Sequence, residues 1–380
     1  MRMIPDGRSY EEIYRAFRWQ IPERFNIAQL VCDRHAEGEA VALIHQQLDG
    51  SVRRWSFREM ARASNRVANL LRAAGLQGGE RVALLLGQDP EVPMVHLGAW
   101  KAGLISLPLS RLFGDEALVA RLGDSGAAVL VTDRDGWAKV APLLDRLPAL
   151  KQVWLTDGEE SGAPSLHALL ERASDAFEPV ACGPATPAYM NYTSGTTGQP
   201  KGVLKGHASI LGLVPNVEFA NEFFPQPGDL AWSPADWSWM AGMTNVLFAS
   251  WYHGVPVLAF RSRGFDAEEV LTTLARHGVR NALLTPTMLK MMRQLPNAAA
   301  LGARLRSITS GSEPVGAELM EWSRRTLGVG INVVFGQTEC NMVLVNNQQV
   351  MAVKPGSLGR PAPGHRVAIV DEEGRELPAG

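Results

Sequence analysis

The sequence predicts an α/β fold in which two α/β subdomains carry largely parallel sheets and a distorted β-barrel begins near the end. Apolar strand-like runs alternate with amphipathic helices in residues 1–186 and again in residues 187–355. Strands separated by helices pair in parallel. Residues 356–380 are instead rich in Gly and Pro and contain "RVAIVD" and a "DEEG" turn, which favours β-structure in a separate layer. A chain of 380 residues also exceeds what one hydrophobic core usually serves.

The first subdomain has clear helix and strand signals. Ser56 and Glu59 form a capping-box pattern at the start of a predicted helix. Gly75 can end this helix in the left-handed conformation. The run "RVALLLG" is almost wholly apolar, as expected of a strand covered on both faces. A helix over 91–101, the strand "LISLPL", the helix "DEALVARLGD" and the strand "AAVLVTD" continue the alternation.

The second subdomain repeats this alternation. Its predicted elements, in order, are the helix "AEEVLTTLARHG", the strand "VRNALLTP", the helix "TMLKMMRQL", the strand "LRSITSG", the helix "AELMEWSRRTLG" and the strand "INVVFGQTE". Residues 240–260 carry no Lys, Arg, Asp or Glu, yet Asn245, His253 and Pro256 interrupt the apolar run. We therefore expect a buried strand after a helix there, and no membrane span.

Composition excludes some functions. The formal net charge of −2 gives no basic field for nucleic acid. Cys32, Cys182 and Cys340 lie far apart without metal-ligand spacing, which favours free thiols in a reducing cytoplasm. The N-terminal residues lack the apolar run of a secretory signal. We expect a cytoplasmic protein, for which a homodimer is one arrangement.

Residues 192–202, "YTSGTTGQPKG", form a candidate phosphate loop. Glycines let backbone N–H groups converge on an anion, Ser and Thr add hydroxyl donors, and Lys201 adds a positive charge. Gly195 and Gly198 are only three residues apart, and the following "GVLKGH" looks extended. A Walker A loop instead has four residues between its glycines and a helix behind them. The pattern predicts strand, loop, strand; the alternative is a glycine-rich hairpin turn with a solvated lysine.

This loop and several other segments resemble the adenylate-forming acyl-CoA synthetases. The others are His207, "ADWSWMAG" (235–242), "SGSEPVG" (310–316), "FGQTE" (335–339) and "GSLGRPAPG" (356–364). They occur in the family's order and cover essentially the whole chain. Ser312 departs from the pattern, because the family usually has Gly there.

The resemblance implies an AMP-forming acid–thiol ligase. A carboxylate attacks the α-phosphate of ATP, pyrophosphate leaves, and coenzyme A then displaces AMP to give an acyl-CoA of fatty acid metabolism. Such a displacement between anions needs charge neutralisation and alignment. The implied ligands are ATP, Mg²⁺, coenzyme A and a small carboxylic acid.

The resemblance also implies roles for individual residues. Lys201, Thr338 and Glu339 would be catalytic, with Glu339 holding Mg²⁺ and Thr338 contacting the α-phosphate. The remaining nucleotide-binding candidates are Thr193, Ser194, Gly195, Thr196, Thr197 and Gly198 at the β- and γ-phosphates, Ser312, Glu313 and Pro314 at adenine, and Phe335, Gly336 and Gln337 beside Thr338. For Glu339 and for His207 the alternatives are a surface carboxylate and a structural histidine.

The acyl pocket candidates are Trp239, Met243, Gly336 and Val343. Acetate-specific members of the family place a tryptophan just before "QTE", where this chain has Gly336. We therefore expect a medium-length, branched or aromatic acid rather than acetate. For Trp239, and more so for Trp237, the alternative is a core residue.

Family members continue with a ribose-binding aspartate and a C-terminal lid domain that carries a catalytic lysine, whereas this sequence stops at "LPAG". We therefore expect a truncated chain without the lid, weakly active or inactive in the full reaction. Two other interpretations stay open: an adenylation domain that loads a carrier protein, and a non-catalytic module that binds nucleotide or carboxylate.

Overall fold

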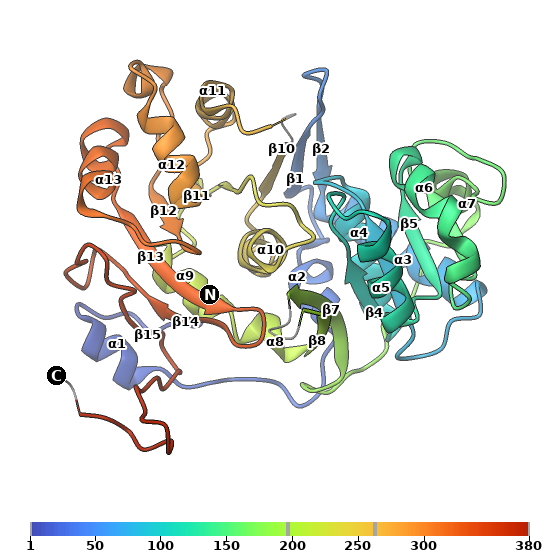
Figure 1. The fold of residues 1–380 in the computed structure, drawn as a ribbon, viewed down its shortest axis with the longest axis horizontal. Helices are drawn as coiled ribbons and strands as arrows, with labels where there is room; N and C mark the ends of the chain where they lie inside the picture. Colours follow the sequence, from blue (N-terminus) through green and yellow to red (C-terminus); the bar gives the residue numbers. More distant parts are fainter. Residues whose placement is uncertain (1, 195–197, 261–263, 379–380) are drawn as a thin grey trace. The chain divides into compact units, whose positions relative to one another are not determined.

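The structure is a computed structural model that describes residues 2–194, 198–260 and 264–378. The chain divides into a larger unit (residues 21–211 and 229–266) and a smaller unit (residues 1–20, 212–228 and 267–380). Figure 1 shows both, coloured along the sequence. The predicted boundaries at 186/187 and 355/356 stay a prediction.

The larger unit contains a six-stranded sheet in the order β6-β5-β3-β4-β7-β8. Its strands are β3 (Arg81–Leu85), β4 (Ile105–Pro108), β5 (Val129–Thr132), β6 (Gln152–Leu155), β7 (Pro187–Ser194) and β8 (Pro200–Gly206). All neighbours pair in parallel except β7 and β8, which form an antiparallel hairpin. The apolar run predicted as a covered strand is β3, and four of its five residues are buried.

Helices connect these strands, and Figure 1 shows several of them around β4 and β5. They are α3 (Phe57–Ala73), α4 (Glu91–Lys101), α5 (Asp115–Ser125), α6 (Arg134–Val140) and α7 (Leu166–Arg172). The helices α2 (Ile27–Val31) and α8 (Ala208–Leu211) lie near the two ends of residues 21–211. Two 3-10 turns, η1 (Asp33–His35) and η2 (Ala141–Arg146), complete this part of the chain. The predicted capping box is present, because the Ser56 and Glu59 side chains each bind the other's backbone N–H. Gly75 takes φ +85° just beyond the end of α3, as predicted.

Four further strands of the larger unit pair in the order β9-β10-β1-β2. They are β1 (Val41–Gln46), β2 (Val52–Ser56), β9 (Ala231–Trp232) and β10 (Val257–Phe260). The residues that carry no charge, 240–260, form the π-helical turn η3 (Ala241–Phe248), α10 (Ala249–Tyr252) and β10. The predicted strand after a helix is therefore confirmed. Within the described ranges no helix is long and apolar enough to cross a membrane.

The smaller unit carries the strands β11 (Asn281–Leu283), β12 (Ser307–Ser310), β13 (Ile331–Gln337), β14 (Asn341–Val345) and β15 (Arg360–Pro361). β11, β12 and β13 are parallel, and β14 and β15 continue the sheet in antiparallel pairing. Its helices are α1 (Tyr10–Ala16), α9 (Val214–Ala220), α11 (Ala267–His277), α12 (Pro286–Arg293) and α13 (Ala317–Trp322), with η4 (Ala298–Leu301) and the π-helical turn η5 (Ser323–Leu327). The predicted α/β class with largely parallel sheets is confirmed.

The distorted β-barrel stays a prediction. Beyond β15, the described residues contain a bridge between Val370 and Glu376 around a turn in which Asp371 accepts hydrogen bonds from the backbone of Glu373 and Arg375. The predicted "DEEG" turn is therefore present.

Candidate nucleotide and acyl site

The candidate phosphate loop joins two antiparallel strands. In the β7–β8 hairpin Thr193 lies opposite Lys201 and Ser194 opposite Pro200. The predicted strand, loop, strand arrangement is therefore confirmed. Ser194, Gly198 and Lys201 are exposed, and Gly198 takes φ +84°, a conformation that suits glycine. Gly195, Thr196 and Thr197 lie outside the described residues.

One face of β7 anchors this hairpin to the core of the larger unit. Met190 and Tyr192 pack against the leucine-rich cluster that includes Leu118 and Leu122 of α5. The Tyr192 hydroxyl donates a hydrogen bond to the Asp124 carboxylate. Burial raises the pKa of the Tyr192 hydroxyl above its ordinary value, and the neighbouring Asp124 charge raises it further. The hydroxyl is therefore a stable hydrogen-bond donor beside the phosphate loop.

The other face of β7 presents Asn191 toward the segment 235–242. The Asn191 amide donates to the backbone carbonyl of Ser238 at 3.1 Å. Gly242 lets this segment fold back closely, because a Cβ there would lie 2.5 Å from the Ala235 oxygen. Sequence reasoning missed this contact, since residues 191 and 238 are far apart along the chain.

The acyl pocket candidates of the larger unit differ in burial. Met243 is fully buried in η3, whereas the Trp239 side chain is 54% exposed. Trp237 is only 1% exposed and serves the core. Of the two tryptophans, Trp239 is therefore the one that a ligand can reach in this structure.

In the smaller unit the carboxyl ends of two parallel strands bring two predicted segments together. β12 and β13 are neighbours, with Ser310 opposite Val333. "SGSEP" leaves the end of β12, and "FGQTE" begins within β13. A Cβ on Gly311 would lie 2.7 Å from the oxygen of Val334, so "SGSEP" packs against the residue that directly precedes "FGQTE". In open α/β sheets this edge is where ligands usually bind.

The "SGSEP" segment has an unusual backbone. Ser312 takes φ +73°, a conformation that favours glycine, and the family usually has glycine at this position. The Glu313 carboxylate accepts hydrogen bonds from the Thr287 hydroxyl, with both oxygens at 2.9 Å. Ser312, Glu313 and Pro314 are all exposed. The segment therefore offers backbone groups on an open surface.

The "FGQTE" segment ends in a tight turn between β13 and β14. Phe335, Gly336, Gln337 and Glu339 are exposed, and Thr338 is half-buried. A register shift separates Phe335 from Gly336, and a Cβ on Gly336 would lie 2.1 Å from the Asn341 oxygen. The glycine thus permits a close approach of two strands. Its role in opening an acyl pocket stays a prediction, as does that of Val343, half-buried on β14.

The magnesium role of Glu339 stays a prediction. Its exposed carboxylate lies in the β13–β14 turn. The described residues contain no group of three or more His, Cys, Asp or Glu side chains that could hold a metal alone. Mg²⁺ commonly binds through one or two carboxylates together with substrate phosphates and water. A single carboxylate is therefore enough for an ion that arrives with ATP.

His207 lies at the end of the phosphate hairpin and is fully buried. Its Nδ1 accepts a hydrogen bond from the backbone N–H of Ile27 at 3.1 Å. Burial lowers the pKa of His207 to about 4. The imidazole is therefore neutral at pH 7.

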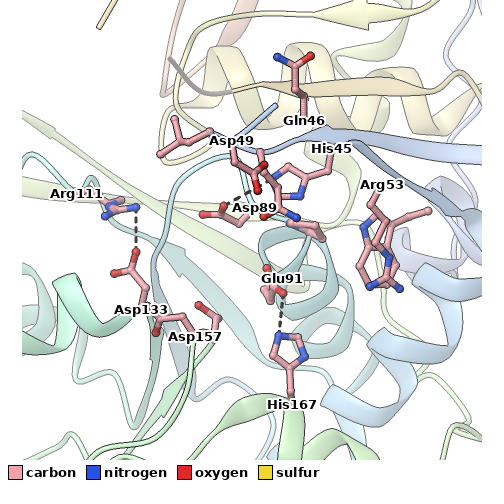
Figure 2. A pocket seen from close by; sticks show the side chains of 15 residues that line it. His45, Gln46, Asp49, Arg53, Asp89, Glu91, Arg111, Asp133, Asp157 and His167 are labelled. Carbon is pink, nitrogen blue, oxygen red and sulfur yellow. Dashed lines mark ion pairs between the residues drawn. The ribbon is translucent and has the colours of Figure 1, made fainter. Parts of the chain in front are cut away.

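A separate cavity of about 740 Å³ is lined by the β1–β2 hairpin and by residues that follow β3, β4, β5 and β6. Figure 2 shows the side chains that line it. It contains more acidic than basic groups, with five carboxylates against two arginines in its lining. Arg111 pairs with Asp133 at 2.9 Å and His167 with Glu91 at 3.0 Å. The Glu91 hydrogen bond raises the pKa of His167 above its ordinary value. This acidic lining is poorly suited to the phosphates of ATP.

Comparison with known proteins identifies the family. The family model "AMP-binding enzyme" matches residues 32–380. Acetyl-coenzyme A synthetase of Bacillus subtilis (strain 168) is 31% identical over 390 residues, covering 98% of this chain and 67% of that protein. The Brucella canis acyl-CoA synthetase structure has 30% identity and a TM-score of 0.90, covering 97% of this chain and 70% of that chain. The anthranilate CoA ligase AuaEII, solved in complex with anthranoyl-AMP, has 25% identity and a TM-score of 0.85, covering 95% and 68%.

This chain spans about two thirds of the length of the curated relatives it matches. The match extends through all the motifs from "YTSGTTGQPKG" to "GSLGRPAPG". The chain therefore belongs to the AMP-binding enzyme family, and its predicted resemblance to the AMP-forming acyl-CoA synthetases is confirmed.

Proposed function

We propose that the protein activates a carboxylic acid with ATP and passes the acyl group to coenzyme A. A carboxylate oxygen attacks the α-phosphorus, the bond from that phosphorus to the β-phosphate oxygen breaks, and pyrophosphate leaves. The thiol sulfur, after losing its proton, then attacks the acyl carbon, and AMP leaves with the electron pair of the acyl–oxygen bond. The observation that carries the proposal is the β7–β8 hairpin, which presents the exposed Lys201 at the base of a glycine-rich loop.

The residues of the larger unit would bind the leaving group, pyrophosphate. Lys201 and the hydroxyl of Thr193, opposite each other in the hairpin, would bind the β- and γ-phosphates. Ser194, Gly198 and the loop residues 195–197 would add donors to the same phosphates. Holding the departing pyrophosphate lowers the charge repulsion between the attacking carboxylate and the phosphates.

The residues of the smaller unit would bind adenine, the α-phosphate and Mg²⁺. The backbone of Ser312, Glu313 and Pro314 would contact adenine, and the segment from Phe335 to Gln337 would line the nucleotide beside Thr338. Thr338 would donate to the α-phosphate, and Glu339 would hold Mg²⁺. The bound Mg²⁺ would neutralise phosphate charge.

For the acid we propose an apolar body longer than acetate. Trp239 is exposed in the segment that flanks β7 and offers apolar surface near the phosphate hairpin, whereas Met243 is fully buried in this structure. Val343 and Gly336 stay predicted contacts of the acyl group. The ligand of AuaEII, anthranoyl-AMP, is an aryl acyl-adenylate, which supports an aromatic acid as one member of this class.

The test supplies the protein with ATP, Mg²⁺, coenzyme A and a panel of acids from acetate to octanoate and benzoate. Chromatography follows AMP and the acyl-CoA. We expect both products in equal amounts and at a low rate, with longer or aromatic acids preferred over acetate. Glu339→Gln should lower AMP formation by about 10²-fold, as removal of a transition-state contact does. ADP in place of AMP, or AMP formation independent of the acid, would refute the proposal.

A further inference from the structure

Asn191 has a buried oxygen without a hydrogen-bond donor. Its side chain is 5% exposed, and its Nδ2 donates to the Ser238 carbonyl at 3.1 Å. Because a carbonyl can only accept, this bond fixes the orientation of the amide. The Oδ1 atom is therefore an acceptor turned away from Ser238 O, and no donor reaches it within the part of the chain that the structure describes.

Ser238, in contact with Asn191, repeats the pattern. Its Oγ is also buried and lacks a partner among the described residues. Buried polar atoms without partners are rare in folded proteins, because each loses its hydrogen bonds with water. Here two of them belong to residues that are joined by a hydrogen bond and lie next to the acyl pocket candidate Trp239.

The position of this pair relates it to the proposed acyl site. Successive side chains of a strand point to opposite faces, so Asn191 shares its face with Thr193 and not with Tyr192. Ser238 directly precedes the exposed Trp239. The acid must bring its carboxylate to the α-phosphate, so its acyl group must lie close to the phosphate hairpin. Asn191 therefore belongs to the phosphate hairpin itself, and Ser238 adjoins the acyl pocket candidate Trp239 in the chain.

We infer that Asn191 and Ser238 select a carboxylic acid whose acyl group carries a hydrogen-bond donor, such as a hydroxyl. The donor would bind Asn191 Oδ1, and the Ser238 hydroxyl, which can donate or accept, would bind the same group. This inference rests on the proposed function and adds a polar requirement to an otherwise apolar pocket.

The chemistry gives the pair a large effect on specificity. A site that hydrogen-bonds a substrate hydroxyl rejects an analogue that lacks it, because the buried polar groups then stay unpaired. A methyl group occupies nearly the same space as a hydroxyl but donates no hydrogen bond. Hydroxybenzoates and methylbenzoates therefore make matched pairs, compared at the ortho, meta and para positions.

The experiment measures kcat/KM for pyrophosphate release, and the dissociation constant of each acid by calorimetry, in wild type, Asn191→Leu and Ser238→Ala. For at least one ring position we expect the hydroxy acid to exceed the methyl acid by about 10²-fold in wild type. Asn191→Leu should reduce this preference below about threefold while leaving KM for ATP unchanged. Ser238→Ala, a smaller change, tests the pair if the leucine variant does not fold. Asn332→Leu, at a buried asparagine of the smaller unit, is the control that should keep the preference.

Equal kcat/KM values and equal dissociation constants for the hydroxy and methyl acids of every pair in wild type would overturn the inference. Asn191 Oδ1 and Ser238 Oγ would then bind only structural water. A preference that survives both variants overturns it as well. If no acid releases pyrophosphate, the proposed function fails, and the calorimetric comparison still decides the inference from binding alone.

Discussion

The Tyr192 hydroxyl, at the start of the phosphate loop, donates a hydrogen bond to Asp124 near the end of α5. The two residues are 68 positions apart along the chain. This bond ties the β7–β8 hairpin to the helix that packs beside it. The position of the loop that we assign to the leaving pyrophosphate thus depends on α5.

Tyr192→Phe removes this tie without removing the ring. We expect the dissociation constant of ATP to rise about three- to tenfold, the usual worth of one hydrogen bond, while that of AMP stays constant. Calorimetry with both nucleotides measures this. Tyr14→Phe is the matched control, since the Tyr14 hydroxyl donates to the His365 carbonyl in the smaller unit. An equal rise in the dissociation constant of AMP would show that Tyr192 stabilises the whole fold and not the phosphate loop alone.

Lys201→Ala tests which part of ATP the hairpin holds. A lysine on the β- and γ-phosphates is worth about 10- to 100-fold in ATP affinity as a charged hydrogen-bond donor. AMP has neither phosphate, so its affinity should not change. Competition binding with ATP, ADP and AMP gives the three ratios. The exposed Lys151, in contact with Glu80, supplies the control Lys151→Ala. A loss of AMP affinity that equals the loss for ATP would remove Lys201 from the pyrophosphate side.

Gly336→Ala tests the close approach of β13 and β14. The added Cβ would lie 2.1 Å from the Asn341 oxygen and 2.7 Å from the Met342 Cα, so the backbone must shift. We expect a loss of about 1–3 kcal/mol in the free energy of unfolding, as for other overpacked sites. Urea denaturation measures it. Gly123→Ala on α5 meets no atom within 4 Å and should instead add about 0.5–1 kcal/mol. If Gly336→Ala is neutral, the turn that carries Glu339 is less constrained than the structure indicates.

Two buried histidines predict a loss of stability in acid. Burial lowers the pKa of His207 to about 4 and that of His96 to about 3, from an ordinary 6.5. Below pH 6.5 the unfolded chain binds protons that the folded chain does not. The free energy of unfolding is therefore unaffected by these two groups above pH 6.5. It decreases as the pH falls from 6.5 toward 4 for His207 and toward 3 for His96. Each histidine adds up to about 1.4 kcal/mol per pH unit to this slope.

His207→Asn keeps an acceptor for the Ile27 N–H and removes the titration. Urea midpoints between pH 6 and 4.5 should fall less steeply for this variant than for wild type. His167→Asn is the control, because the pKa of His167 is raised and not lowered, so that its removal should not make the slope shallower. An unchanged slope for His207→Asn would contradict a buried neutral imidazole.

The sequence predicted features that depend on neighbouring residues. The capping box of α3, the covered strand β3 and the strand, loop, strand order of the phosphate hairpin follow from local patterns and match the structure. Ser312 stood out only as a departure from the family's glycine, and its φ of +73° now gives that departure a physical meaning.

Contacts between distant segments could not be predicted in this way. The Tyr192–Asp124 bond and the Asn191–Ser238 bond each depend on how the sheet places residues that are many positions apart. The close approach at Gly336 depends on a register shift that no sequence pattern marks. The cavity is lined by the β1–β2 hairpin of one sheet and by residues that follow β3 to β6 of the other, and no sequence pattern predicts that these segments lie together.

The most direct test of the adenylation chemistry is acid-dependent exchange between ATP and labelled pyrophosphate, measured without coenzyme A. Exchange requires the reversible formation of acyl-AMP and nothing beyond it. We predict label in ATP only when an acid is present, with loss of exchange in Glu339→Gln. Label that enters ATP without an acid, or its absence with every acid although ATP binds, would contradict the assignment of this chain as an acid-activating enzyme.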